Sequence, residues 1–139
     1  MFVTVSTGTG GGLILNGQLM QGKNGKAGHI GLALLDESTC IEDVSCGRYT
    51  ERTPDKLAAS AAVIARMIAN KTIELDLEAV SIGGGVALGV PDYLDLVRKN
   101  IASFKPEYHA EIYQAALGDD AGLIGAATYA HNNIFKAGS

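Results

Sequence analysis

Thr7-Gly8-Thr9-Gly10-Gly11-Gly12 joins one apolar, strand-like run to another and carries almost no side chain. Four glycines within the last five positions leave the backbone N–H groups uncovered. Such groups can converge on an anion, and no Cβ atom blocks a phosphate. The stretch matches neither the P-loop nor the dinucleotide fingerprint. It therefore predicts either a phosphate-binding turn, with the two threonine hydroxyls as further donors, or a flexible hairpin turn.

Short strands are predicted on both sides of this glycine stretch. Residues 2–6 alternate bulky and β-branched side chains, and residues 13–15 form a short apolar run. Asn16-Gly17, placed before residues 18–20, is typical of a type I′ hairpin turn. We therefore expect three antiparallel strands at the start of the chain.

The middle of the chain predicts a long loop, a helix and a second glycine turn. Residues 22–53 are glycine-rich and then acidic, without an apolar period, and we expect a loop there. Pro54 begins a helix with apolar residues at helical spacing, expected to end near Asn70. Residues 79–82 predict a buried strand that leads into Gly83-Gly84-Gly85. Ligands bind at this end of the strands in open α/β sheets.

The last third predicts helix, strand and helix. A helix is expected from about Pro91 to residue 104, a strand at about residues 110–116, and a final helix from Asp119 or Asp120 to about His131. Gly122 and Gly125 in that helix suggest tight contact with the sheet or with a ligand. The order is three antiparallel strands, then α-β-α-β-α. This order describes an α/β fold, the ribonuclease-H-like half of an actin-like ATPase domain.

Composition limits the classes of function. The 139 residues suit one domain, and the formal net charge of −4 argues against nucleic acid as a partner. No apolar run is long enough to span a membrane, and the first residues do not resemble a signal peptide, so we expect a cytoplasmic protein without a membrane partner. Cys40 and Cys46 are then expected as free thiols or as metal ligands.

Four ordered motifs resemble the ROK family of sugar kinases. They are residues 6–17, Gly25-Lys26-Ala27-Gly28-His29-Ile30-Gly31, residues 81–86 and residues 118–127. The resemblance is strongest to members that phosphorylate N-acetylmannosamine in sialic acid catabolism. It covers most of the chain and identifies it with the carboxyl-terminal half of such a kinase.

The resemblance implies an actin-like kinase of two lobes that transfers the γ-phosphate of ATP, with Mg²⁺, to the 6-hydroxyl of an N-acetylhexosamine. Thr7 and residues 8–12 would lie at the ATP phosphates, and residues 83–85 near the adenosine. His29 and Glu51 fall on sugar-binding positions of the family. Phosphoryl transfer depends on positioning and charge stabilisation, which suits such turns.

The chain departs from the family pattern in its catalytic group. The family's amino-terminal lobe supplies an Asn-Asp pair whose Asp acts as the base, and no such pair occurs in these residues. We therefore predict no catalytic residue here and expect the chain alone to be inactive, unless a separate amino-terminal lobe pairs with it. The helical segment before Pro54 is also expected to be shortened, so the sugar loop of the family is altered.

The family's zinc site is also not reproduced. Without gaps, its His falls on Leu32 and its three Cys on Glu42, Val44 and Tyr49, whereas a two-residue shift recovers only Cys46. Structural zinc needs four nitrogen or sulfur ligands, so we expect no zinc.

An alternative function is a non-catalytic module that binds nucleotide or forms a dimer. Family members commonly associate through the second lobe, and an apolar face left without its partner lobe favours a homodimer.

Overall fold

The computed structural model describes residues 1–48 and 51–135. Its strands are β1 (Phe2–Val5), β2 (Thr9–Gly12), β3 (Ile14–Leu15), β4 (Gln18–Leu19), β5 (Ala79–Gly83) and β6 (Glu111–Gln114). Its α-helices are α1 (Ile41–Ser45), α2 (Pro54–Leu75), α3 (Gly85–Gly89), α4 (Tyr93–Ala102) and α5 (Ala121–Ala130). Short 3₁₀-helices are η1 (Ile30–Leu32), η2 (Pro106–Tyr108) and η3 (Gly118–Asp120), and a π-helical turn, η4 (His131–Phe135), follows α5.

The main sheet has the strand order β2-β1-β5-β6. β1 pairs antiparallel with β2 and parallel with β5, and β5 pairs parallel with β6. β3 and β4 form the predicted hairpin, in which Asn16 and Gly17 have φ angles of 51° and 75°. Positive values at both positions are those of a type I′ turn. The predicted order of antiparallel strands followed by alternating helices and parallel strands is therefore confirmed, but the first strands number four rather than three and belong to two sheets.

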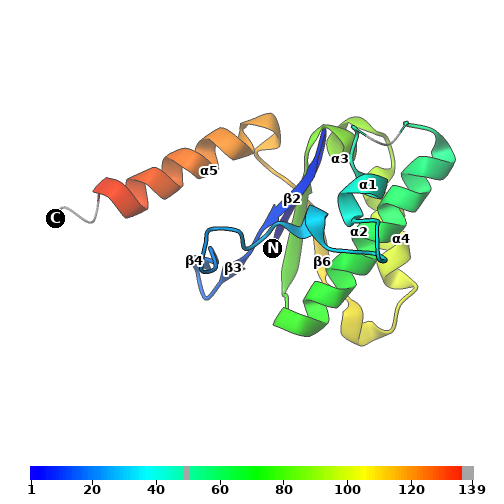
Figure 1. The fold of residues 1–139 in the computed structure, drawn as a ribbon, viewed down its shortest axis with the longest axis horizontal. Helices are drawn as coiled ribbons and strands as arrows, with labels where there is room; N and C mark the ends of the chain where they lie inside the picture. Colours follow the sequence, from blue (N-terminus) through cyan, green and yellow to red (C-terminus); the bar gives the residue numbers. More distant parts are fainter. Residues whose placement is uncertain (49–50, 136–139) are drawn as a thin grey trace.

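One face of the sheet is covered by α2 and α4 (Figure 1). Val3, Val80 and Ile82 of the strands and Ile64 and Ile68 of α2 are fully buried there. The strands supply every second side chain to this face, as a two-residue period requires. This layer forms the hydrophobic core.

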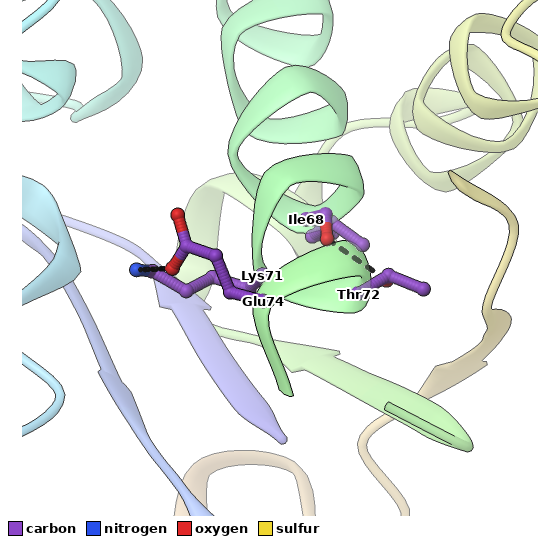
Figure 2. Close-up of polar contacts among 4 residues, drawn as sticks. All are labelled: Ile68, Lys71, Thr72 and Glu74. Carbon is purple, nitrogen blue, oxygen red and sulfur yellow. Dashed lines mark hydrogen bonds and ion pairs between the residues drawn. The ribbon is translucent and has the colours of Figure 1, made fainter. Parts of the chain in front are cut away.

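α2 is longer than predicted and continues to Leu75. Figure 2 shows its last turns, where the Thr72 hydroxyl donates to the carbonyl oxygen of Ile68 at 2.9 Å and Lys71 pairs with Glu74. The helix stops at Asp76, whose φ of 50° is left-handed. The bonded and buried Thr72 side chain belongs to the helix, so the prediction of an end near Asn70 is wrong.

Two other local predictions need correction, and one short helix was not predicted. Residues 9–12 form β2 rather than a loop, so most of the glycine stretch belongs to the sheet. α1 and η1 lie within residues that we predicted as loop. α3 follows the second glycine turn directly, and each of these missed helices is five residues or fewer. Elements this short show no complete apolar period in a sequence.

α5 runs away from the sheet on the side opposite to α2 and α4 (Figure 1). None of its residues is buried in the described part of the chain. A Cβ atom added at Gly122 or Gly125 would meet no other atom within 4 Å. Of the two predicted alternatives, tight contact of this helix with the sheet is therefore wrong, and contact with a ligand stays a prediction. Among the described residues, no helix combines the length and the apolar character needed to cross a membrane.

Candidate functional site

The two glycine turns lie side by side at the carboxyl ends of β1 and β5. The strands are in register, with Thr4 opposite Gly83. Gly84 has a φ of 96°, and a Cβ atom there would lie 2.5 Å from the carbonyl oxygen of Val5. Only glycine fits such a close approach of two backbones. The sheet thus joins the two sequence-distant turns at one edge, where open α/β sheets bind ligands.

The segment after α1 also holds the first turn, through two backbone hydrogen bonds. The amide of Gly47 donates to the Ser6 carbonyl oxygen at 2.6 Å, and the amide of Arg48 donates to that of Thr7 at 3.2 Å. Of the predicted phosphate-binding residues, only Thr7 and Gly8 therefore lie in an open turn. Residues 10–12 extend from it as part of the paired strand β2.

A cavity of about 380 Å³ opens beside this turn. Its lining includes Thr9, Gly10 and Gly11 of β2 and His29 of the following loop. The loop reaches β2 because of its glycines, since a Cβ atom at Gly31 would lie 2.1 Å from the Thr9 carbonyl oxygen. The sequence-predicted His29 is exposed and is thereby brought beside the predicted residues 9–11.

Glu42 is the acidic residue of this cavity, and the sequence-based reasoning missed it as a binding residue. Its Oε2 accepts a hydrogen bond from the Thr9 amide at 2.9 Å. A Cβ atom at Gly8 would lie 3.0 Å from the same oxygen. The predicted Glu51, by contrast, is exposed in the segment before α2, pairs with Lys56 at 3.2 Å and is not among the described residues that line the cavity. The carboxylate beside His29 is therefore that of Glu42.

A chain of buried hydrogen bonds fixes the helix that carries Glu42. The hydroxyls of Thr9 and Ser45 are 2.7 Å apart, and the Ser60 hydroxyl donates to the Ser45 carbonyl oxygen at 3.1 Å. The Ser60 hydroxyl also lies 2.7 Å from the hydroxyl of Tyr93. Burial raises the pKa of Tyr93 to about 12. The network links α1 to β2, α2 and α4, so the position of Glu42 is set by the core.

A second cavity, of about 260 Å³, lies beside α3, the helix that follows the second glycine turn. Leu88, Asp92, Tyr93 and Gln114 are among its lining residues, which come from α3, α4 and the end of β6. Tyr93 lies at both the second cavity and the end of the hydrogen-bonded chain that begins at Thr9. The hydrogen-bonded chain therefore connects the linings of the two cavities.

The cysteines flank α1 as free thiols, Cys46 buried and Cys40 half-buried. The amide of Cys40 donates to Asp43 Oδ2 at 2.8 Å, and this bond holds the pKa of the Asp43 carboxyl below its usual range. Within residues 1–48 and 51–135, no three His, Cys, Asp or Glu residues are grouped as metal ligands would be. Tyr49, on which one position of the family's zinc site falls, lies outside the described residues.

Comparison with known proteins identifies similar chains. The model of the ROK family matches residues 1–53 and 48–133. The N-acetylmannosamine kinase of Haemophilus influenzae (strain PittEE) is 38% identical over 160 aligned residues, which cover 91% of this chain and 53% of the relative. That of Pasteurella multocida (strain Pm70) is 37% identical and covers 91% of this chain and 54% of the relative. This chain spans about half the length of the curated relatives that it matches.

A solved structure agrees with these sequence matches. The crystal structure of a ROK hexokinase from Thermus thermophilus superposes with a TM-score of 0.82 at 27% sequence identity, covering 92% of this chain and 55% of the hexokinase. The predicted fold, the α/β fold of actin-like sugar kinases, is therefore confirmed. The predicted resemblance to N-acetylmannosamine kinases is confirmed as well.

Proposed function

Because this chain belongs to the ROK family, we propose that it forms the part of a sugar kinase that binds an N-acetylhexosamine and the phosphates of ATP. In this proposal it corresponds to the carboxyl-terminal lobe. The observation that carries the proposal is the cavity lined by His29 and Glu42 together with Thr9, Gly10 and Gly11, which follow the first glycine turn. The 37–38% identity to N-acetylmannosamine kinases makes N-acetylmannosamine the first substrate to test.

The sugar side of the proposal rests on the chemistry of Glu42 and His29. A carboxylate accepts hydrogen bonds from sugar hydroxyls, and an imidazole can accept or donate one. The cavity volume of about 380 Å³ lies within the range of small-molecule sites. Because Thr9 and Ser45 fix one side of the cavity, the sugar meets a carboxylate that is already in place.

The nucleotide side rests on the two turns at the strand ends. Thr7 and Gly8 offer an open backbone turn, and Gly84, with Gly85 beside it, packs against the end of β1. Magnesium binds at such sites through phosphate oxygens and one or two carboxylates, so the absence of a larger acidic cluster among the described residues fits a metal that arrives with ATP. When bound, Mg–ATP supplies the phosphoryl group, and these residues hold its phosphates.

We assign no catalytic base to the residues of this chain. Among the described residues, no carboxylate other than Glu42 lines the cavity, and Glu42 already accepts a hydrogen bond from the Thr9 amide. The base that accepts the proton of the sugar 6-hydroxyl would come from a polypeptide region equivalent to the half of the relatives that this chain does not span. The chain alone would then bind its ligands without turnover.

Calorimetric titration with N-acetylmannosamine tests this proposal. Glu42→Gln keeps an acceptor for the Thr9 amide but removes the charge, and it should weaken sugar binding about tenfold or more, because a charged hydrogen-bond partner is lost. Glu51→Gln is the matched control, because Glu51 lies outside the cavity, and it should leave the affinity unchanged. Absence of sugar binding by the unmodified chain, or equal effects of the two substitutions, would contradict the proposal.

An assay of ADP release on the same sample tests the missing base. With Mg–ATP and N-acetylmannosamine present, we expect no sugar-dependent release of ADP. Release would show that the chain contains its own base.

A second candidate function, a dimerisation module, is favoured by a different observation. α5 contains no charged residue and none of its residues is buried. Apolar surface of this kind usually marks an interaction site. Self-association to a homodimer is therefore part of the proposed function.

A further inference from the structure

A third cavity, of about 440 Å³, lies between α2, the segment after α4 and η2. α2 and α4 pack side by side on the covered face of the sheet (Figure 1), and η2 contacts α2. This cavity shares no described lining residue with the one that contains His29 and Glu42. Its volume is in the range of small-molecule sites. It is therefore a separate candidate site, which the proposed function does not use.

Four side chains with hydrogen-bond donors line this cavity, which we call the basic cavity. They are Arg66 and Asn70 of α2, Lys105 and Tyr108. Arg66 and Asn70 are four residues apart, so they lie on the same face of the helix. Within residues 1–48 and 51–135, no hydrogen bond or ion pair engages any of these four side chains, and no acid is among the lining residues. The donors are thus available to an anion.

The sequence of α2 explains why Arg66 has no ion pair. Elsewhere on the same helix, Lys71 pairs with Glu74, three positions away. The residues three and four positions from Arg66 are uncharged, namely Ala62, Val63, Ala69 and Asn70. Although the whole chain has a formal net charge of −4, the basic cavity therefore combines two positive charges with no negative one.

The rest of the cavity is apolar and is held by the backbone. Ala69 is buried, and Phe104 packs against the hydrophobic core, so both give the cavity an apolar wall. The amide of Tyr108 donates to the carbonyl oxygen of Lys105 at 3.0 Å, and a ring nitrogen of His109 lies 3.0 Å from the carbonyl oxygen of Phe104. These bonds fix the segment that carries Lys105, so the two positive charges face a wall that is already formed.

We propose that the basic cavity binds a small organic phosphate monoester, with Arg66 and Lys105 at the phosphate and the wall of Ala69 and Phe104 against its carbon skeleton. Near neutral pH such a phosphate carries between one and two negative charges and three acceptor oxygens. A guanidinium fork and an ammonium group both bind such oxygens through charge-assisted hydrogen bonds. A cation would find no carboxylate among the described lining residues.

Two classes of metabolite contain this chemistry, sugar phosphates and nucleoside monophosphates. The first probe is N-acetylmannosamine 6-phosphate, because it is the product of the reaction to which the proposed function belongs. Only this choice of probe rests on the proposed function, since the site itself is argued from its own residues. AMP is the second probe, and inorganic phosphate is the third, because it has the charge without the carbon skeleton.

Calorimetric titration of the chain with each probe tests the proposal. Arg66→Gln and Lys105→Gln should each weaken binding of an organic probe about tenfold or more, because each removes a charge-assisted hydrogen bond. Lys99→Gln is the matched control, since Lys99 is an exposed residue of α4 outside the basic cavity and the substitution removes the same charge. It should leave the affinity unchanged. Glutamine is a good helix former, so Arg66→Gln should fold.

The outcomes separate this site from the proposed sugar site. Tighter binding of either organic probe than of inorganic phosphate supports the apolar wall, and the tighter of the two identifies the class of ligand. Binding of none of the three probes, equal effects of Arg66→Gln and Lys99→Gln, or equal affinity for inorganic phosphate would overturn the proposal. So would a probe that Glu42→Gln weakens and Arg66→Gln does not, because that probe occupies the sugar site. If N-acetylmannosamine fails to bind while Arg66-dependent binding persists, only the proposed function is contradicted.

Discussion

α2 and α5 are the two helices whose difference says most about this molecule. α2 carries charged residues, such as Asp55, Arg66 and Glu74, yet eight of its 22 residues are buried against the sheet and α4. α5 carries no charged residue, yet none of its residues is buried. In this chain, the more apolar of the two helices is the one that the fold leaves exposed.

The difference teaches that the sheet is completed on one side only. The covered side holds the buried network that positions Glu42, so the candidate sugar site is supported by the chain itself. The side of the sheet that carries α5 has no comparable network among the described residues, and we infer that a second polypeptide covers it. Matched substitutions on the two sides measure this asymmetry.

Truncating an apolar side chain should give the largest difference between the two helices. Ile68→Ala removes a fully buried side chain of α2 and should lower the free energy of unfolding by about 2–5 kcal/mol. Leu123→Ala should change it by less than about 0.5 kcal/mol in the monomer, because Leu123 is 73% exposed. Urea denaturation at low protein concentration measures both. Similar losses would mean that α5 is packed within one chain.

Replacing glycine by alanine should destabilise the fold at Gly84 and stabilise it at Gly122. Gly84→Ala places a side chain on a residue with a positive φ and brings its Cβ atom against the Val5 carbonyl oxygen. It should lower the free energy of unfolding by about 1–3 kcal/mol or more. Gly122→Ala meets no atom and should stabilise α5 by about 0.5–1 kcal/mol relative to glycine. Thermal unfolding distinguishes the two, and a stabilising Gly84→Ala would contradict the geometry of the turn.

Removing a tyrosine hydroxyl should give the smallest difference. Tyr93→Phe breaks the buried bond to Ser60 and should cost about 1 kcal/mol, whereas Tyr129→Phe breaks an exposed bond to Gln21 and should cost less than about 0.5 kcal/mol. Equal costs in denaturant unfolding would place the two hydroxyls in equivalent surroundings.

The same tyrosine predicts a pH dependence. Because burial raises the pKa of Tyr93 to about 12, above the unfolded value near 10, its neutral form stabilises the fold. This contribution is complete below pH 10 and is lost as the pH rises through 12. Between pH 10 and 12, the free energy of unfolding should fall more steeply with pH for the unmodified chain than for Tyr93→Phe. Parallel curves would contradict it.

The parts of the fold that depend on local chemistry could be predicted from the sequence. Asn16-Gly17 specifies its own turn, because positive φ angles at both positions require residues of this kind. Residues 79–83 were identified by a buried apolar run that ends in glycines. Such signals need no knowledge of distant contacts.

The parts of the fold and of the candidate site that depend on tertiary contacts could not be predicted from the sequence. Glu42 reaches the cavity because α1 folds back onto β2 through the Thr9–Ser45 bond, whereas the ungapped match to the family pattern points to Glu51 instead. Gly122 indicated close packing, but small residues do not say whether the neighbour belongs to the same chain. The two acids Glu42 and Asp43, which fall in the first turn of α1, were the available signal for this short helix.

Hydrogen exchange measured at several protein concentrations tests the asymmetry of the two helices most directly. Amides in residues 60–72 of α2 should exchange slowly at every concentration, because they belong to the core. Amides of α5 should exchange rapidly on dilution and become protected as concentration rises, because a ten-residue helix with no buried residue is marginal. Strong protection of α5 that does not change on dilution would contradict the account, since the helix would then be stable without a second polypeptide.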